Sequence, residues 1–162
     1  SKIYGFNSVG LRYFNVFGPR QNPDGPYSAV IPKWIKKMLS NEDIEIYGDG
    51  TTSRDFCYIQ NVIHANLLSA AKSNEIGVDF FNVAYGETTT LNELFQLIRE
   101  ELAEKGISYN KSPIYKDFRQ GDVKHSLADL DKSKKILNYE GTVSLREGLK
   151  KTVEYYLLEF KN

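Results

Sequence analysis

Apolar positions along the chain recur at two different spacings, and these spacings predict strands and helices in turn. Short apolar runs and every-second-residue alternation predict strands at 9–16, 44–47, 54–59, 79–84 and 114–119. Helical spacing predicts helices at 28–39 and 61–73, from 91 until Gly106, at 131–137, and from 145 toward the C-terminus. Because strands alternate with helices throughout, the pattern predicts an α/β fold.

Two of the predicted helices open with a capping box, in which a Ser or Thr precedes a Glu by three residues. Thr90 and Glu93 open one helix, and Ser144 and Glu147 open the C-terminal one. The helix predicted at 61–73 is rich in small residues, and its spacing places Ile63, Leu67, Ala70 and Ala71 on one side. In the C-terminal helix the apolar spacing predicts a buried stripe of Leu145, Leu149, Val153, Tyr156, Leu157 and Phe160.

Composition narrows the class of protein. The 162 residues are 41% hydrophobic and 26% charged, which is typical of a globular domain of ordinary size. Lysine plus arginine equal aspartate plus glutamate at 21 each, so no overall basic field favours nucleic acid or a membrane surface as partner. No apolar run reaches the roughly 18 residues of a membrane span, and the first residues carry no signal-peptide pattern.

Cysteine and histidine are too few for a disulfide or a zinc site. Cys57 is the single cysteine, so no internal disulfide forms, and one thiol with two histidines does not complete a structural zinc centre. Neither His64 nor His125 has a second histidine or a cysteine at helical spacing. We therefore expect no metal ion and a reducing, cytoplasmic location.

Two arginines stand on predicted loop positions where an anion can be bound. Arg54 follows a Gly-Asp-Gly turn, and Arg119 lies in a glycine-containing loop. A guanidinium group matches phosphate oxygens in a bidentate fashion, so the two together could bind a diphosphate. The alternatives are a surface ion pair of Arg54 with Asp49 or Asp55 and a solvated Arg119.

Other positions fit a ligand or an ordinary structural role equally well. Asn15 ends the first predicted strand, where open α/β sheets bind ligands, or is a turn amide. The helix start at 29–31 offers backbone N–H groups to a planar amide or a phosphate, or is only a helix start. Tyr47 could stack on a ring or pack in the core. No glycine-rich dinucleotide loop, serine elbow or supported Cys/His pair occurs, so the chain shows no self-sufficient catalytic constellation.

A series of motifs in order along the chain resembles the extended short-chain dehydrogenase/reductases that act on nucleotide sugars. The motifs are LRYFNVFGPRQ at 11–21, AVIPKW at 29–34, YGDGTTSRDFCYI at 47–59, FNVA at 81–84, RQGDVKHS at 119–126, EGL at 147–149 and TVEYY at 152–156. The wording at 29–34 and 53–59 is most similar to the bacterial UDP-N-acetylglucosamine 4-epimerase branch. The resemblance covers essentially the whole chain.

The resemblance is to the C-terminal half of the family. It implies that residues 1–20 are the last strand and turn of a truncated Rossmann domain and that 21–162 form the UDP-sugar binding domain. Family members carry a Gly-rich loop and a Tyr-x-x-x-Lys pair upstream, and none of the eleven tyrosines here has a lysine four positions later. We therefore expect a fragment that is inactive alone, binds no NAD by itself, and needs the missing Rossmann half as partner; the full-length isomerase would use NAD and form a homodimer.

The resemblance also implies roles for individual residues. Asn15 would contact the diphosphate or sugar, and Tyr13 would lie toward the nicotinamide. Backbone groups of Ala29, Val30 and Ile31 would hold the uracil, with Tyr47 beside the base or ribose. Arg54 and Arg119 would neutralise the diphosphate, and Asp122 would reach the ribose or orient Arg119. No catalytic residue is expected in this chain.

Several readings of the function stay open. The first is the substrate-binding part of a UDP-N-acetylglucosamine or UDP-sugar 4-epimerase in nucleotide-sugar and surface-polysaccharide biosynthesis. The others are a part of a UDP-glucuronate epimerase or nucleotide-sugar dehydratase, a stand-alone nucleotide-sugar binding module, or a folded fragment with most of its site missing. The shared motifs hold the nucleotide and leave the sugar undefined.

Overall fold

The computed structural model describes residues 3–24 and 29–160, and these divide into two compact units. The first unit comprises Ser1–Val16, Asp55–Glu87 and Leu127–Leu145. The second comprises Phe17–Arg54, Thr88–Ser126 and Arg146–Asn162. Each unit is therefore assembled from three separate stretches of chain, and this grouping differs from the single boundary after residue 20 that the sequence suggests. The functional division at residue 20 stays a prediction.

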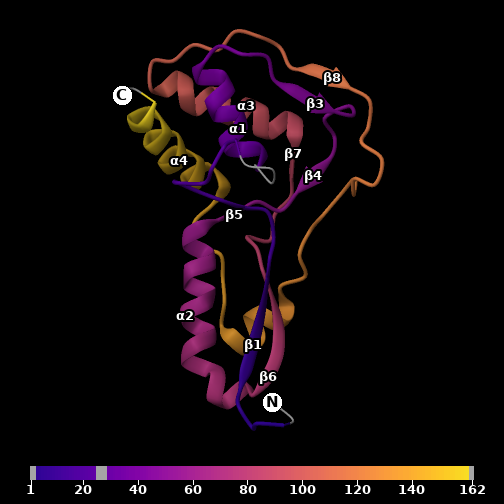
Figure 1. Ribbon diagram of the computed structural model, residues 1–162, viewed down its shortest axis with the longest axis vertical. Helices are drawn as coiled ribbons and strands as arrows, with labels where there is room; N and C mark the ends of the chain where they lie inside the picture. Colours follow the sequence, from indigo (N-terminus) through magenta and orange to yellow (C-terminus); the bar gives the residue numbers. More distant parts are fainter. Residues whose placement is uncertain (1–2, 25–28, 161–162) are drawn as a thin grey trace. The chain divides into compact units, whose positions relative to one another are not determined.

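The first unit is built on a parallel pair of strands joined by a long helix (Figure 1). Strand β1 (Ser8–Tyr13) pairs with β6 (Val78–Val83), and α2 (Ile59–Ile76) precedes β6 and packs on both strands. Two neighbouring parallel strands run in the same direction, so the chain must return to the starting end of the sheet between them. A tight turn is too short for this, and a long crossover connection is needed. The unit also contains β5 (Cys57–Tyr58) and η1 (Ser133–Leu137), a single π-helical turn where a short helix is predicted.

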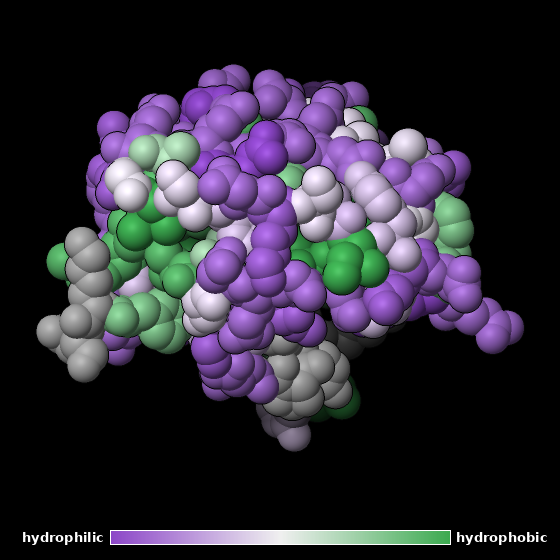
Figure 2. Space-filling model, turned by 90° about the horizontal axis from the view of Figure 1, so that it is seen from above, coloured by the Kyte–Doolittle hydropathy of each residue, from purple (hydrophilic) through white to green (hydrophobic). Residues whose placement is uncertain are grey.

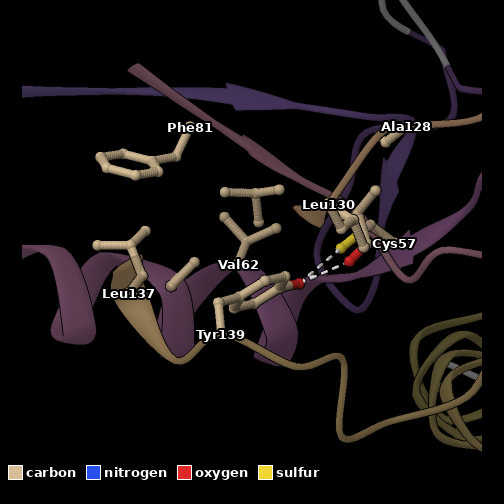
Figure 3. Packing of buried hydrophobic residues seen from close by; sticks show 10 residues of the cluster. Cys57, Val62, Phe81, Ala128, Leu130, Leu137 and Tyr139 are labelled. Carbon is tan, nitrogen blue, oxygen red and sulfur yellow. Dashed lines mark hydrogen bonds between the residues drawn. The ribbon is translucent and has the colours of Figure 1, made fainter. Parts of the chain in front are cut away.

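The core of the first unit gathers around one side of α2. Figure 3 shows Val62, Phe81 and Leu137 close together there, with the hydroxyl of Tyr139 directed at Cys57. The Tyr139 hydroxyl donates to the Ala84 carbonyl at 2.7 Å, so a fully buried polar group is satisfied. This bond joins the end of β6 to the segment after η1.

The apolar side of α2 that the spacing picks out is not the side that the fold buries. Ile63 and Leu67 are 53% and 66% exposed, and Ala70 and Ala71 are exposed as well. The face against the strands carries small and polar residues instead, namely Asn61, Val62, Ala65 and Ser69. Asn61 can be buried because its amide accepts from the Thr142 and Val143 N–H groups at 3.0 Å each and donates to the Val143 carbonyl at 2.8 Å. The spacing of apolar residues alone does not predict a buried helix face whose side chains are small or are hydrogen-bonded polar groups.

In the part of the second unit that the structure describes, three helices and four short strands are connected by loops. The helices are α1 (Val30–Leu39), α3 (Leu91–Glu104) and α4 (Leu145–Glu159), the last of which begins at the unit boundary. The strands are β3 (Glu45–Tyr47), β4 (Ser53–Arg54), β7 (Thr89–Thr90) and β8 (Ile114–Lys116), while β2 (Val16–Phe17) spans the boundary. Helices α1 and α3 pack through the rings of Trp34 and Phe95, whose centroids are 6.3 Å apart.

The helix starts in this unit follow the predicted pattern. The Thr90 hydroxyl accepts from the Glu93 N–H, and the Glu93 carboxylate accepts from the Thr90 N–H, so the capping box is confirmed. Helix α4 begins at Leu145 as predicted. Of its predicted stripe, Leu149, Val153 and Tyr156 are buried, whereas Phe160 is 44% exposed and stacks on Tyr156. Lying beyond the last helical residue, Phe160 covers the end of the stripe instead of extending it.

The predicted strand at 54–59 is two short strands with an interruption. The residues between β4 and β5 are Asp55 and Phe56, both buried. The Asp55 side chain accepts backbone N–H groups from elsewhere, which diverts the chain from a regular ladder. Strand β4 pairs antiparallel with β7, and β3 pairs parallel with β8.

Hydrophilic and hydrophobic residues both reach the surface. Figure 2 shows one face on which hydrophilic residues predominate and hydrophobic ones gather in a few separate areas. None of the helices formed within residues 3–24 and 29–160 is both long and apolar enough to cross a membrane.

Candidate functional site

Two segments of the second unit run side by side, and four of the nine predicted site residues lie on them, namely Tyr47, Arg54, Arg119 and Asp122. Strand β3 pairs with β8 so that Tyr47 lies opposite Lys116. Farther along, Ser53 is bridged in parallel to His125: its N–H donates to the Lys124 carbonyl at 2.9 Å, and its carbonyl accepts from Ser126 at 3.1 Å. The second segment is longer between these two points, and its excess residues form a turn.

That turn carries Arg119 and Asp122. The Asp122 N–H donates to the Arg119 carbonyl at 3.2 Å, which closes the turn. Both residues are exposed. The turn is anchored by Phe118, whose ring lies against Gly48; a Cβ added to Gly48 would lie 2.3 Å from that ring. Glycine is therefore required at position 48 by the close approach and by its φ of +87°.

The guanidinium group of Arg119 stacks on the ring of Tyr47. Its central carbon lies 3.7 Å from the ring centroid. A cation over an aromatic face is attracted by the ring quadrupole. The N–H donors of a guanidinium group lie in its own plane, so stacking leaves them directed away from the ring and able to bind an anion.

Arg54 is held by carbonyl groups of the same two segments. One terminal nitrogen donates to the Ser53 carbonyl at 2.9 Å and lies 3.4 Å from the Lys124 carbonyl. Asp49 accepts instead from the N–H and hydroxyl of Thr51, at 2.9 and 2.6 Å. In the described part of the chain no carboxylate oxygen lies within 4.0 Å of either Arg54 or Arg119, so the surface ion-pair alternative for Arg54 is not what the structure shows.

The predicted uracil contacts lie at the start of α1. Ala29 is the N-terminal cap residue, in an extended conformation, and no side chain caps the helix there. Val30 and Ile31 are the first two helical residues, and Pro32 follows within the first turn, where its missing N–H costs no helical bond. Residues 25–28, which include the predicted helix start at position 28, lie outside the described residues.

The remaining predicted residues belong to the first unit. Asn15 has a left-handed backbone with φ of 34°, and its side-chain amide donates to the Asp55 carbonyl at 3.0 Å. Its own carbonyl accepts from the Cys57 N–H at 3.2 Å. Tyr13 donates through its hydroxyl to the Asn66 side chain at 3.1 Å. Asn15 thus has a structural role across the chain, unlike the local turn amide of the alternative reading.

Sequence reasoning considered Asp55 only as a partner for Arg54 and so missed its position. Asp55 is fully buried, and its carboxylate accepts N–H groups from Tyr85, Gly86 and Ala128. Burial raises the pKa of this carboxyl above its ordinary value of 3.8, and the three backbone donors act in the opposite direction. The available signal was an acidic residue inside a predicted strand, directly before the apolar run at 56–59.

A separate cavity lies in the second unit, away from the two arginines. It has a volume of about 560 Å³ and lies between α3 and β8. Within it, Asn92 accepts from the Tyr115 hydroxyl at 3.0 Å and donates to the Asp49 carbonyl at 3.2 Å, while Glu93 serves the capping box. No group of three or more potential metal ligands occurs among the residues that the structure describes.

Known proteins resemble this chain in both sequence and fold. The UDP-glucuronate 4-epimerase of Thermodesulfobacterium geofontis is 32% identical over 154 residues, covering 94% of this chain and 44% of that protein. The crystal structure of the UDP-glucose 4-epimerase of Thermotoga maritima with UDP-glucose is 42% identical, with a TM-score of 0.88 over 98% of this chain and 48% of that one. The UDP-N-acetylglucosamine 4-epimerase of Methanobrevibacter ruminantium, in complex with UDP-N-acetylmuramic acid, is also 42% identical, with a TM-score of 0.85 and the same coverage.

These similarities cover about half the length of each relative. The sequence profile of the NAD dependent epimerase/dehydratase family matches residues 1–84, just over half of this chain. Both the α/β architecture and the order of motifs agree with this match. The chain belongs to the NAD dependent epimerase/dehydratase family.

Proposed function

We propose that this chain binds the nucleotide of a UDP-sugar as the substrate-binding part of a longer NAD-dependent UDP-sugar 4-epimerase. The observation that carries the proposal is a pair of arginines on two adjacent segments, one of them stacked on an aromatic ring, and neither has a carboxylate partner among the residues that the structure describes. A diphosphate supplies the two negative charges that such groups match. UDP-N-acetylglucosamine is the substrate we favour, in the synthesis of nucleotide sugars for surface polysaccharides.

Each site residue has a proposed role. Arg54 and Arg119 bind the diphosphate, and Asp122 contacts the ribose or orients Arg119. Tyr47 lies beside the base or ribose. Backbone groups of the α1 start at Ala29, Val30 and Ile31 bind the uracil edge, because the first N–H groups of a helix have no partner within it. In the first unit, Asn15 contacts the diphosphate or sugar, and Tyr13 lies toward the nicotinamide.

The residues of this chain do not by themselves fit NAD. The sequence has no glycine-rich dinucleotide loop, and the Tyr13 hydroxyl is engaged with Asn66. We therefore derive no redox step from these residues. NAD and the proton-transferring Tyr-x-x-x-Lys pair belong, in this proposal, to the rest of the longer protein, which forms a homodimer, and the chain alone is inactive.

A second candidate substrate is UDP-glucuronic acid. The relative from Thermodesulfobacterium geofontis carries that specificity in its name and is 32% identical. Both candidates share the UDP group, so the residues proposed to bind the nucleotide do not separate them.

Calorimetric titration of the chain with UDP tests the proposal. We expect the chain to bind UDP, and Arg54→Ala to lose roughly 2–5 kcal/mol of binding free energy, as for a buried charge contact. Arg119→Ala should weaken binding in the same direction. Arg99→Ala is the matched control, because Arg99 belongs to α3 and contacts Phe95.

Two results would contradict the proposal. The first is equal UDP affinity in Arg54→Ala and the unchanged chain. The second is epimerisation of UDP-N-acetylglucosamine or UDP-glucuronic acid by the chain alone, since the redox groups would then lie within it. Adding the upstream half of the longer protein in trans should restore turnover and identify the preferred sugar.

A further inference from the structure

The chain passes between its two units five times, and Asp55 stands at one of these passages. The passages fall at 16/17, 54/55, 87/88, 126/127 and 145/146. Asp55 is the first residue after the second passage and is 0% exposed. The residue before it, on the other side of this passage, is Arg54.

The hydrogen bonds of Asp55 reach residues beside three other passages. One carboxylate oxygen accepts from Tyr85 at 3.0 Å, and both oxygens accept from Gly86, at 3.2 and 3.1 Å. The second oxygen also lies 3.4 Å from the Ala128 nitrogen. The Asp55 carbonyl accepts from the Asn15 amide at 3.0 Å. Each of three partners lies within two residues of a passage: Asn15, Gly86 and Ala128. Asp55 is therefore hydrogen-bonded to chain segments at three passages and stands itself at a fourth.

Burying the Asp55 carboxylate costs free energy, so its hydrogen bonds must compensate for the lost hydration. A buried carboxylate loses its hydration and is tolerated only when it is well hydrogen-bonded. Asn15 adopts a left-handed backbone with φ of 34°, a conformation that is uncommon outside glycine and that asparagine tolerates better than most residues. Two bonds hold it there: its amide to the Asp55 carbonyl, and the Cys57 N–H to its own carbonyl.

We propose that Asp55 is a positioning residue that fixes the chain at four passages and holds Asn15 in place for nucleotide binding, without contacting the nucleotide. The inference rests on the proposed function only in its last step, where Asn15 and Arg54 bind the ligand. Asp55→Asn keeps the shape of the side chain but replaces one acceptor oxygen with a donor facing backbone N–H groups. In this variant, the hydrogen bonds beside the passages should weaken before the rest of the unit is destabilised.

The experiment measures amide hydrogen exchange by NMR together with UDP affinity, at a temperature where circular dichroism shows the variant fully folded. In Asp55→Asn we expect exchange at Tyr85, Gly86, Ala128 and Cys57 to accelerate at least tenfold, while the β1–β6 ladder is unchanged. We expect UDP affinity to fall at least tenfold. The matched control is Asp79→Asn, which lies in the same unit and loses the ion pair with Lys132; its UDP affinity should not change.

Each outcome decides the proposal. Unchanged exchange at the four amides, or a uniform loss of protection with intact UDP affinity, overturns it, the latter because Asp55 would then be merely structural. If the unchanged chain does not bind UDP, the proposed function fails, and acceleration confined to the four amides still supports the positioning role of Asp55.

A second measurement covers the case in which Asp55→Asn does not fold. In the unchanged chain, the amide shifts of Tyr85, Gly86 and Ala128 should titrate together with one pKa above 3.8, since all three face the same carboxyl. Glu87 is the neighbouring acid whose charge acts on Asp55, and Glu87→Gln separates its titration. Independent titration of the three amides would overturn the proposal.

Discussion

Arg54 and Arg119 carry the same charge but are held in different ways. Arg54 donates to carbonyl groups of its own segment pair, which fixes its guanidinium close to the backbone. Arg119 is exposed and depends on the face of Tyr47 for its position. A lysine could replace the charge at 119 but not the flat stacking surface, because an ammonium group is a compact point charge.

Cys57 illustrates how burial alters the chemistry of one side chain. Its thiol is fully buried beside the Tyr139 hydroxyl, and burial raises the pKa of the thiol to about 11. The thiolate is the reactive form of cysteine, so at pH 8 nearly all of the native thiol is protonated and shielded.

We therefore predict slow labelling of Cys57 by Ellman's reagent at pH 8 in the native chain. In guanidinium chloride the same thiol should react within minutes, since unfolding exposes it and returns its pKa to the ordinary range. The single cysteine makes the absorbance change a direct measure of this site. Labelling of the native chain as fast as that of the unfolded chain would disprove the prediction.

At the scale of elements, α2 shows that a helix can be oriented by its small and polar residues. Asn61, Ala65 and Ser69 face the strands, and Ile63 and Leu67 face away. Ser69 satisfies its buried hydroxyl by donating to the Ala65 carbonyl at 2.7 Å. Of the larger apolar residues of the helix, Val62 is buried and Ile59, Leu68 and Ile76 pack against the core, while Ile63 and Leu67 are exposed.

This orientation predicts an unusual pattern of mutational sensitivity along α2. Leu67→Gln should change the free energy of unfolding by no more than about 0.5 kcal/mol, because Leu67 is exposed. Ala65→Leu should cost about 1–3 kcal/mol, because a buried small residue has no room to grow. Urea unfolding followed by circular dichroism measures both; a larger cost at Leu67 than at Ala65 would reverse the orientation of the helix.

At the scale of the whole molecule, the two units are each closed by contacts between distant stretches of chain. Tyr139 is an example in the first unit, since its hydroxyl reaches Ala84 and its ring is fully buried among residues of the 55–87 segment. In the second unit, the Tyr156 hydroxyl donates to the Gln21 carbonyl, which joins α4 to the chain before α1. Such bonds connect residues that local sequence patterns cannot relate.

We predict that Tyr139→Phe lowers the free energy of unfolding by about 1–3 kcal/mol, because the buried Ala84 carbonyl loses its donor. Tyr115→Phe is the matched control. The Tyr115 hydroxyl donates to the Asn92 side chain, but Tyr115 is 52% exposed, so water can replace the bond that this variant loses. Thermal unfolding of the two variants decides the matter. An equal loss of unfolding free energy in the two variants would contradict the prediction, because the buried hydrogen bond of Tyr139 would then contribute no more than the exposed one of Tyr115.

Much of this architecture could be predicted because it is written in local patterns. The helix starting at Leu91 follows from Thr90, Glu93 and an apolar stripe, all within a few turns of one another. The two arginines were recognisable as candidate anion ligands from their loop positions and motifs. Asp55 was not, since its role depends on N–H groups thirty or more residues away.

By itself, then, the sequence determined the order of strands and helices, the capped start of α3 and the family to which the motifs point. These depend on spacing between near neighbours, which a chain carries whatever its tertiary fold. Only the tertiary structure decided which face of α2 is buried, how Arg119 comes to lie on Tyr47, and why a carboxylate is buried at position 55. Each of these is set by hydrogen bonds and packing between segments that meet only when the chain folds.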